Sequence, residues 1–209
     1  MINQPSHKNV SRLSQIMLEG VEEIAGRSGV RAALNAAELS NLYELAATSA
    51  EPTAEFPFNE LSAIQTALEA MYGKRGGRGI TLRAGRAAFK YVLRAYGSWL
   101  NLLDLNYRLL PAPVRFKTGL EVLANLFSDM GRTSIAVVES SDAWYWRIER
   151  CPFCWQIKSN EPVCTFLVGF LQEFFTWASG GKVYHVQETE CLAMGKTACV
   201  IKVDVRPLE

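Results

Sequence analysis

The side chains with the clearest capacity for chemistry are five cysteines, all of which lie after residue 150 of this 209-residue chain. Two of them, Cys191 and Cys199, flank a Gly-Lys turn in the segment ETECLAMGKTACV. If this turn joins two antiparallel strands symmetrically about Gly195, the two cysteines face each other with β-carbons roughly 4.5 to 5.5 Å apart. Such a pair can form a disulfide or share a metal ion.

The other three thiols keep both possibilities open. Cys151 and Cys154 form a Cys-Pro-Phe-Cys motif, and Cys164 lies in the first turn of a predicted helix. A C-x-x-C motif with two further cysteines is a recurrent zinc pattern, although the spacing here matches no standard finger or ribbon. The alternatives are small buried thiols that only fill the core, or a redox pair.

The composition indicates the surroundings in which these thiols would work. The formal net charge of +1 gives no global field that would attract nucleic acid or an anionic membrane. The first residues have no apolar signal-peptide core, and no stretch reaches the roughly 20 apolar residues needed to span a bilayer. We therefore expect a cytoplasmic protein with no membrane span and no nucleic-acid partner, whose reducing surroundings favour metal ligation over disulfides.

Hydrophobic periodicity predicts the helices that must support the cysteines. An N-terminal helical arm and a proline-containing linker at 49–58 together make up residues 1–58 and precede the main, ligand-binding domain (59–209). The two parts can still form one globular unit. A glycine-rich basic loop, GKRGGRGITLRAGR, is predicted at 73–86. The predicted helices are 11–25, 30–45, 59–73, a long helix that follows the loop to residue 100, and 112–130.

Beyond residue 131 the pattern changes to β-branched and aromatic runs, which are typical of strands. The predicted order is two strands (133–140 and 143–150), a buried helix (161–181), and a terminal hairpin (182–190 and 197–205). Helices followed by this arrangement predict an α+β fold in which N-terminal helices pack with an antiparallel sheet and a buried helix.

Aromatic residues are concentrated around the strand and helix next to the cysteines. An apolar pocket with few polar groups binds flat hydrophobic ligands well, although aromatic residues also simply fill cores. The candidate ligand-binding residues are Trp144, Trp146, Phe153, Trp155, Phe166, Phe170 and Phe174.

The glycine-rich segment raises a second binding possibility, because Arg78, Arg83 and Arg86 could contact an anion next to backbone amides at a helix start. The alternative is a glycine-rich turn followed by a solvated arginine face. The chain has no Ser-His-Asp set, no H-E-x-x-H motif and no nicotinamide or flavin motif, so no catalytic residues and no enzymatic activity are predicted.

Three stretches carry a family resemblance: CPFC, then EPVC opening a helix with VGFLQEFF, then ETECLAMGKTAC before an apolar last strand. Together they resemble the 4-vinyl reductase (4VR) or hydrocarbon-binding domain, and the segment from residue 71 to 97 resembles stand-alone members such as the vinyl-reductase-like protein of bacteriochlorophyll biosynthesis. The resemblance implies an α+β fold around an apolar ligand cavity, and a homodimer.

The resemblance also implies a zinc ion, at Cys164, Glu188, Cys191 and Cys199, with Cys151 and Cys154 as alternative ligands. In strand alternation Glu188 and Cys191 fall on opposite faces unless a bulge intervenes near Thr189 and Glu190, which is an argument against Glu188.

The predicted function is therefore a zinc-containing carrier or sensor of a hydrophobic small molecule, such as a tetrapyrrole or chlorophyll precursor. Two alternatives remain. One is a dimeric assembly or scaffold factor, with a protein partner, in which the cavity is vestigial. The other is an accessory protein of bacteriochlorophyll vinyl reduction.

Overall fold

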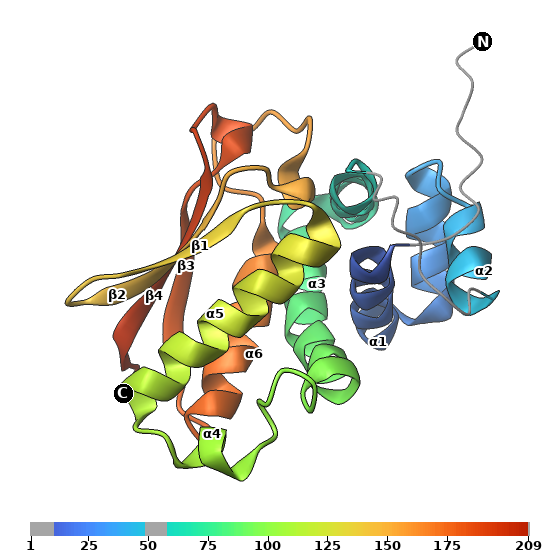
Figure 1. Ribbon diagram of the computed structural model, residues 1–209. Coiled ribbons are helices and arrows are strands. Elements are labelled where there is room, and N and C mark those ends of the chain that lie inside the picture. Colours follow the sequence, from blue (N-terminus) through green and yellow to red (C-terminus); the bar gives the residue numbers. More distant parts are fainter. Residues whose placement is uncertain (1–10, 49–57, 209) are drawn as a thin grey trace.

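Alternating burial along the chain after residue 131 produces a four-stranded antiparallel sheet, which helices cover on one side (Figure 1). The computed structural model describes residues 11–48 and 58–208. The predicted α+β fold is confirmed, including the order of two strands, a buried helix and two strands. The elements are α1 (Arg12–Ala36), α2 (Asn41–Thr48), α3 (Glu60–Tyr96), α4 (Leu105–Leu109), α5 (Ala112–Gly131), β1 (Ile135–Glu139), β2 (Ala143–Ile148), α6 (Thr165–Ala178), β3 (Tyr184–Glu190) and β4 (Cys199–Pro207).

The sheet has the strand order β1-β2-β4-β3. In β2, Trp144, Trp146 and Ile148 are buried on one face, while Tyr145 and Arg147 alternate with them and are partly exposed. The buried face packs against α5 and α6, and α6 in turn packs against α3. The layers therefore run from the sheet through α5 and α6 to α3, with α1 and α2 farthest from the sheet (Figure 1).

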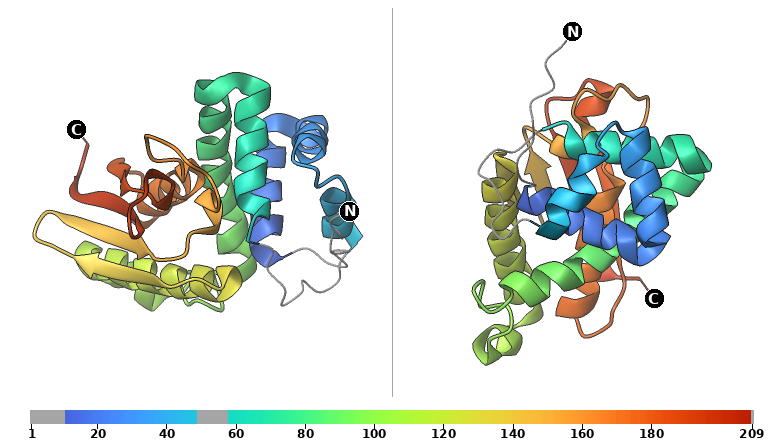
Figure 2. Two further views of the ribbon diagram at one scale, coloured as in Figure 1. Left: turned by 90° about the horizontal axis from the view of Figure 1, so that it is seen from above. Right: turned by 90° about the vertical axis from the view of Figure 1, so that its right-hand side faces the viewer.

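Helix α3 is bent back on itself at Gly73, whose φ of 72° lies in the left-handed region that glycine adopts readily. Residues 60–72 and 74–96 lie side by side as a helical hairpin (Figure 2). The prediction of a loop at 73–86 was therefore wrong, because these residues are helical after the bend. The glycines serve close packing instead: a β-carbon on Gly85 would lie 2.0 Å from the carbonyl oxygen of Phe166, and one on Gly169 would lie 1.9 Å from that of Leu82.

The N-terminal helix is part of the same core as the sheet. Ser11 caps α1, because its side chain accepts a hydrogen bond from the Ser14 amide. Leu13 and Met17 of α1 are buried in the same hydrophobic cluster as Val203 of β4. Apart from Phe58, the predicted linker 49–58 lies outside the described residues, as does His7. None of the helices among the described residues has the length and apolarity to cross a membrane.

Candidate metal centre and aromatic core

Five separate elements bring the cysteines to one end of the sheet. Cys151 follows β2, Cys154 ends a short 3₁₀ turn, Cys164 is the N-cap residue of α6, Cys191 follows β3, and Cys199 begins β4. All five are buried and all are free thiols. The disulfide interpretation of Cys191 and Cys199 therefore does not describe this structure, but the prediction that their sulfurs meet does.

The sulfur atoms lie at separations that suit shared metal ligands. A tetrahedral zinc ion with Zn–S bonds of about 2.3 Å places its sulfur ligands about 3.8 Å apart. The observed Sγ–Sγ distances are 3.4 Å for Cys154–Cys199, 3.5 Å for Cys151–Cys164, 3.7 Å for Cys164–Cys199, 3.8 Å for Cys191–Cys199 and 4.0 Å for Cys164–Cys191. The cluster therefore needs no large rearrangement to accept an ion.

Glu188 joins the cluster because the pairing of β3 with β4 shifts register between Glu188 and Glu190. This is the irregularity that the alternation argument required. One carboxylate oxygen, Oε2, accepts a hydrogen bond of 2.7 Å from the Cys164 amide. The other, Oε1, is buried and has no hydrogen-bond partner among the described residues. Burial raises the pKa of Glu188, so a cation at Oε1 would stabilise its charged form.

Two overlapping sets of four residues have donor atoms within 4.8 Å of one another. One is the set predicted from the resemblance, namely Cys164, Glu188, Cys191 and Cys199. The other joins Cys164 and Cys199 to the two cysteines named as alternatives, Cys151 and Cys154.

The surroundings of the cysteine cluster contain some groups that favour protonated thiols and others that favour negative charge. Burial raises the pKa of the Cys151 and Cys164 thiols, so these groups remain protonated unless a cation compensates the charge of the thiolate. Two features favour negative charge in the cluster. The Leu192 amide donates a hydrogen bond of 3.3 Å to the Cys199 sulfur, and Cys164 is the N-cap residue of α6, next to the positive end of the helix dipole. Hydrogen bonds with Cys151 and the other neighbouring thiols also lower the pKa of Cys154, so negative charge in the cluster is favoured at that position.

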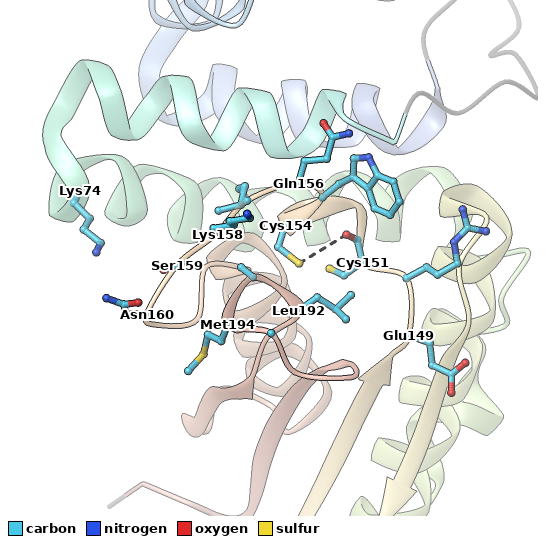
Figure 3. Close-up of a pocket in the computed structure, with 15 residues that line it drawn as sticks. Lys74, Glu149, Cys151, Cys154, Gln156, Lys158, Ser159, Asn160, Leu192 and Met194 are labelled. Carbon is cyan, nitrogen blue, oxygen red and sulfur yellow. Dashed lines mark hydrogen bonds between the residues drawn. The ribbon is translucent and has the colours of Figure 1, made fainter.

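A cleft of about 920 Å³ opens on the outer side of the cluster (Figure 3). Its walls are the loop that follows the Cys-Pro-Phe-Cys motif and the turn between β3 and β4, which the Ser159 amide joins by a 2.9 Å hydrogen bond to the Ala193 carbonyl. Cys151 and Cys154 line this cleft, together with the cationic Lys74, Arg150 and Lys158. This cleft is not among the predicted sites, although the polar run WQIKSN after the motif was a signal for it in the sequence.

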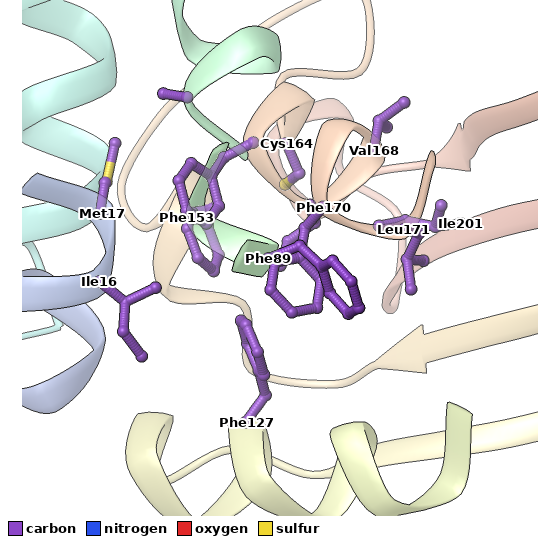
Figure 4. Packing of buried hydrophobic residues seen from close by; sticks show 14 of the residues in the cluster. Ile16, Met17, Phe89, Phe127, Phe153, Cys164, Val168, Phe170, Leu171 and Ile201 are labelled. Carbon is purple, nitrogen blue, oxygen red and sulfur yellow. The ribbon is translucent and has the colours of Figure 1, made fainter. Parts of the chain in front are cut away.

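The candidate ligand-binding residues divide between two places. Six of the seven are buried in the core, where aromatic rings pack against one another, as Phe127 and Phe170 do in Figure 4. The ring centroids of Phe127 and Phe170 are 4.7 Å apart, and those of Phe153 and Phe166 are 5.2 Å apart. Trp155, by contrast, is 37% exposed and lines the cleft. The six core residues are Trp144, Trp146, Phe153, Phe166, Phe170 and Phe174.

Within this aromatic core the two tryptophans of β2 stand out. Trp144 is in ring contact with Phe116 and Phe175, and Trp146 with Phe127. The Nε1 atoms of both tryptophans are buried and have no hydrogen-bond partner among the described residues. Since a buried indole N–H usually finds an acceptor, the core contains two unused donors.

The three arginines proposed as anion contacts are engaged otherwise. Arg78 forms ion pairs with Glu69 at 3.0 Å and Glu161 at 3.1 Å, and Arg86 pairs with Glu173 at 3.2 Å. The Nε of Arg83 donates to the carbonyl of Gly79 in its own helix. Two of the three charges are therefore already balanced by carboxylates, and the sequence pattern gave no sign of these partners.

The sequence and the fold are similar to those of known proteins. Residues 144–205, which contain all five cysteines and both tryptophans of β2, match the sequence model of the 4-vinyl reductase (4VR) domain family. An uncharacterized protein of Methanocaldococcus jannaschii is 32% identical over 68 residues, which cover 32% of this chain. That match spans 37% of the relative, little more than a third of its length.

Solved structures share the fold at low sequence identity. The phenol-responsive sensory domain of the transcription activator PoxR, with phenol, has a TM-score of 0.52 and 18% identity, and the match covers 74% of this chain and 77% of that one. An H-NOX protein from S. oneidensis in the Fe(II)NO ligation state has a TM-score of 0.58 and 10% identity, with 93% and 99% covered. The unliganded H-NOX protein from K. algicida has a TM-score of 0.55 and 12% identity, with 93% and 95% covered.

Proposed function

We propose that this chain binds a hydrophobic small molecule in its aromatic core and acts as a carrier or sensor, with a zinc ion that ties α6 to the terminal hairpin. The observation that carries the proposal is the pair of buried indole N–H groups, of Trp144 and Trp146, that lack an acceptor among the described residues. A buried donor without a partner costs about 1–3 kcal/mol. A ligand that offers an acceptor to these groups recovers that free energy and is thereby held in a defined orientation.

The zinc ion is supported by the donor chemistry of Cys164, Glu188, Cys191 and Cys199. Three thiolates and one carboxylate fill a tetrahedral shell, and the unpartnered Oε1 of Glu188 supplies the fourth donor. A zinc ion so enclosed contributes structural cross-linking, because no position remains for an activated water. Glu188 also accepts a hydrogen bond from the Cys164 amide at the start of α6. A bound ion and a ligand that contacts the aromatic residues of α6 would therefore act on the same helix.

The ligand class that fits is a flat apolar body with one or two hydrogen-bond acceptors. The proteins that share this fold illustrate two such classes, since PoxR responds to phenol and H-NOX structures concern haem distortion. A tetrapyrrole or chlorophyll precursor would meet the same description, and a role beside bacteriochlorophyll vinyl reduction is one form of the proposal. Among the described residues, the histidine His185 is exposed and lies 3.2 Å from Asp204, so it is not placed to bind haem iron in the aromatic core.

The test combines extraction with ligand-dependent stability. Protein purified under reducing conditions is extracted with organic solvent, and the extract is identified by absorbance and mass spectrometry. The identified molecule should raise the Tm of the stripped protein, and Trp144→Phe and Trp146→Phe should each weaken its binding, whereas Trp99→Phe, at a side chain that is 71% exposed, should not. An empty extract together with no ligand-dependent change in Tm would reject the proposal.

A second candidate is a homodimeric assembly factor whose cavity is vestigial, and two observations favour it. The aromatic rings already pack against one another, and large hydrophobic side chains are exposed in and shortly before α4, namely Trp99, Leu105 and Leu109. Leu105 and Leu109 are four residues apart and share one helix face. Light scattering should then give the mass of a dimer, and Leu105→Ser with Leu109→Ser should give a monomer while the fold is retained.

A further inference from the structure

We infer that the cysteine cluster is built for two metal ions that share two bridging thiolates, rather than for one ion with two spare cysteines. The inference rests on the proposed zinc site at Cys164, Glu188, Cys191 and Cys199 and adds a second ion, bound by Cys151 and Cys154 together with the same two shared residues. Cys164 and Cys199 belong to both sets of donors, and their sulfurs lie 3.7 Å apart.

Donor atoms lie on both sides of this shared pair. Each shared sulfur is in contact with a sulfur of the outer pair, at 3.5 Å from Cys164 to Cys151 and at 3.4 Å from Cys199 to Cys154. On the inner side both shared sulfurs contact Cys191, at 4.0 Å and 3.8 Å. Two tetrahedra that share an edge have this arrangement, since a thiolate sulfur has several lone pairs and can bind two ions at once.

The six donors divide without remainder between the two ions. The inner ion takes Glu188 and Cys191 as terminal ligands, and the outer ion takes Cys151 and Cys154. The Cys-Pro-Phe-Cys turn holds the outer pair on one side, because the Cys154 sulfur also contacts the Cys151 carbonyl at 3.8 Å, as Figure 3 shows. No other cysteine exists in the chain, and no cysteine is left outside the two shells.

Charge favours the second ion. Buried thiolates need a compensating charge, and all five cysteines are buried. One divalent ion with four anionic ligands and two divalent ions with six anionic ligands carry the same net negative charge. The second ion therefore converts two buried thiols to bound thiolates, which release their protons to solvent, without any increase in the charge that the core must bury.

The two positions differ in access. Cys151 and Cys154 line the 920 Å³ cleft, whereas Cys164, Glu188, Cys191 and Cys199 do not line it. The outer ion consequently has a path to solvent, and its loop is held to α3 through ion pairs of Glu161 with Lys74 and Arg78. We expect a chelator to remove the outer ion first and the inner ion more slowly.

The experiment is a titration of the metal-free, reduced protein with Co²⁺, followed by thiolate-to-cobalt absorption and by electron paramagnetic resonance. We expect saturation at about two Co²⁺ per chain. The resonance signal should grow with the first equivalent and fall with the second, because bridged ions couple magnetically. Saturation at one ion, or two ions without coupling, overturns the inference, as does iron with acid-labile sulfide in the protein as purified.

Variants separate the two ions. Cys151→Ser with Cys154→Ser should bind about one Co²⁺ with no loss of its resonance signal, and Glu188→Gln with Cys191→Ser should likewise bind about one. His185→Asn, at an exposed side chain on the sheet, is the matched control and should still bind both. If a double variant does not fold, the coupling in the unmodified protein decides alone.

The outcomes also distinguish this inference from the proposed zinc site. One ion in the unmodified protein, retained in the Cys151→Ser and Cys154→Ser variant, overturns the binuclear centre and leaves the proposed site in place. No bound ion in the unmodified protein rejects both.

Discussion

Glu188 and Glu60 are both buried carboxyl groups. In each, one carboxylate oxygen accepts a hydrogen bond and the other has no hydrogen-bond partner among the described residues. The two sites differ in the groups that surround the unpartnered oxygen. Glu188 lies among cysteine sulfurs and accepts from the Cys164 amide. Glu60 accepts a 2.5 Å hydrogen bond from the Ser14 hydroxyl, and belongs to no group of metal donors among the described residues.

The comparison shows two ways to bury a carboxyl group. Desolvation penalises the charged form, and either a proton or a cation can remove the penalty. Burial raises the pKa of Glu60 to about 7, so this group takes a proton. Glu188 has thiols around it that can bind a cation together with it. An unpartnered buried oxygen is therefore not a metal site by itself, and the neighbouring donors decide.

The strongest test of the metal side is Cys164→Ser, because Cys164 belongs to both sets of donors. We expect loss of bound metal and a decrease in the free energy of unfolding on the order of 5 kcal/mol, since metal binding contributes directly to folding. Metal analysis and urea unfolding check it. His185→Asn, at an exposed side chain outside both sets of donors, is the matched control. Equal metal content and stability in Cys164→Ser and the unmodified protein would contradict the cluster's role.

The proton side of the comparison predicts a pH dependence from Glu60. Its folded pKa of about 7 exceeds the ordinary value of 4.5, so its stability contribution is fully present below pH 4.5 and is lost as the pH rises through 7. The loss amounts to at most about 3 kcal/mol. Glu60→Gln should remove this dependence and be more stable than the unmodified protein at pH 8. Urea unfolding of both proteins at pH 5 and pH 8 measures it, and a difference that does not change with pH would contradict the prediction.

Glu188→Gln tests the same comparison at the other carboxyl group. The amide oxygen can still accept from the Cys164 amide, but it binds a metal ion less strongly than a carboxylate. We expect metal affinity to fall by about tenfold to a hundredfold. Competition with a chromogenic chelator measures the affinity. Glu60→Gln is the control and should leave metal affinity unchanged; a similar loss in both variants would remove the distinction between the two regions.

Much of this arrangement was predictable, and the failures have identifiable causes. The change from helical to strand periodicity after residue 131 predicted the sheet, and the buried helix followed from its apolar run. The helical structure of 73–86 was missed because glycine disfavours helices in isolation, whereas here Gly85 allows close contact with α6. Tertiary packing outweighed local propensity.

The cluster was foreseen in its members but not in its geometry. The register shift next to Glu188 depends on how β3 pairs with β4, which alternation within one strand cannot reveal. The Arg78–Glu161 and Arg86–Glu173 ion pairs join residues far apart in sequence, so the charge pattern of one segment could not show these carboxylate partners.

The smallest expected effect concerns the Arg86–Glu173 ion pair. Glu173 is a third carboxylate to compare with Glu188 and Glu60, and unlike them it keeps some contact with water. Side chains of this kind need neither a proton nor a metal ion, because solvent already compensates the charge, and exposed pairs contribute little. Arg86→Ala should therefore lower the free energy of unfolding by about 0.5 kcal/mol, as measured by urea unfolding. The same variant examines the anion-contact prediction. If Arg86 only pairs with Glu173, the Arg86→Ala variant should bind an acidic ligand, such as a tetrapyrrole carboxylate, with the same affinity as Arg83→Ala and the unmodified protein. A loss of affinity in Arg86→Ala alone would show that a ligand carboxylate competes with Glu173 for this arginine.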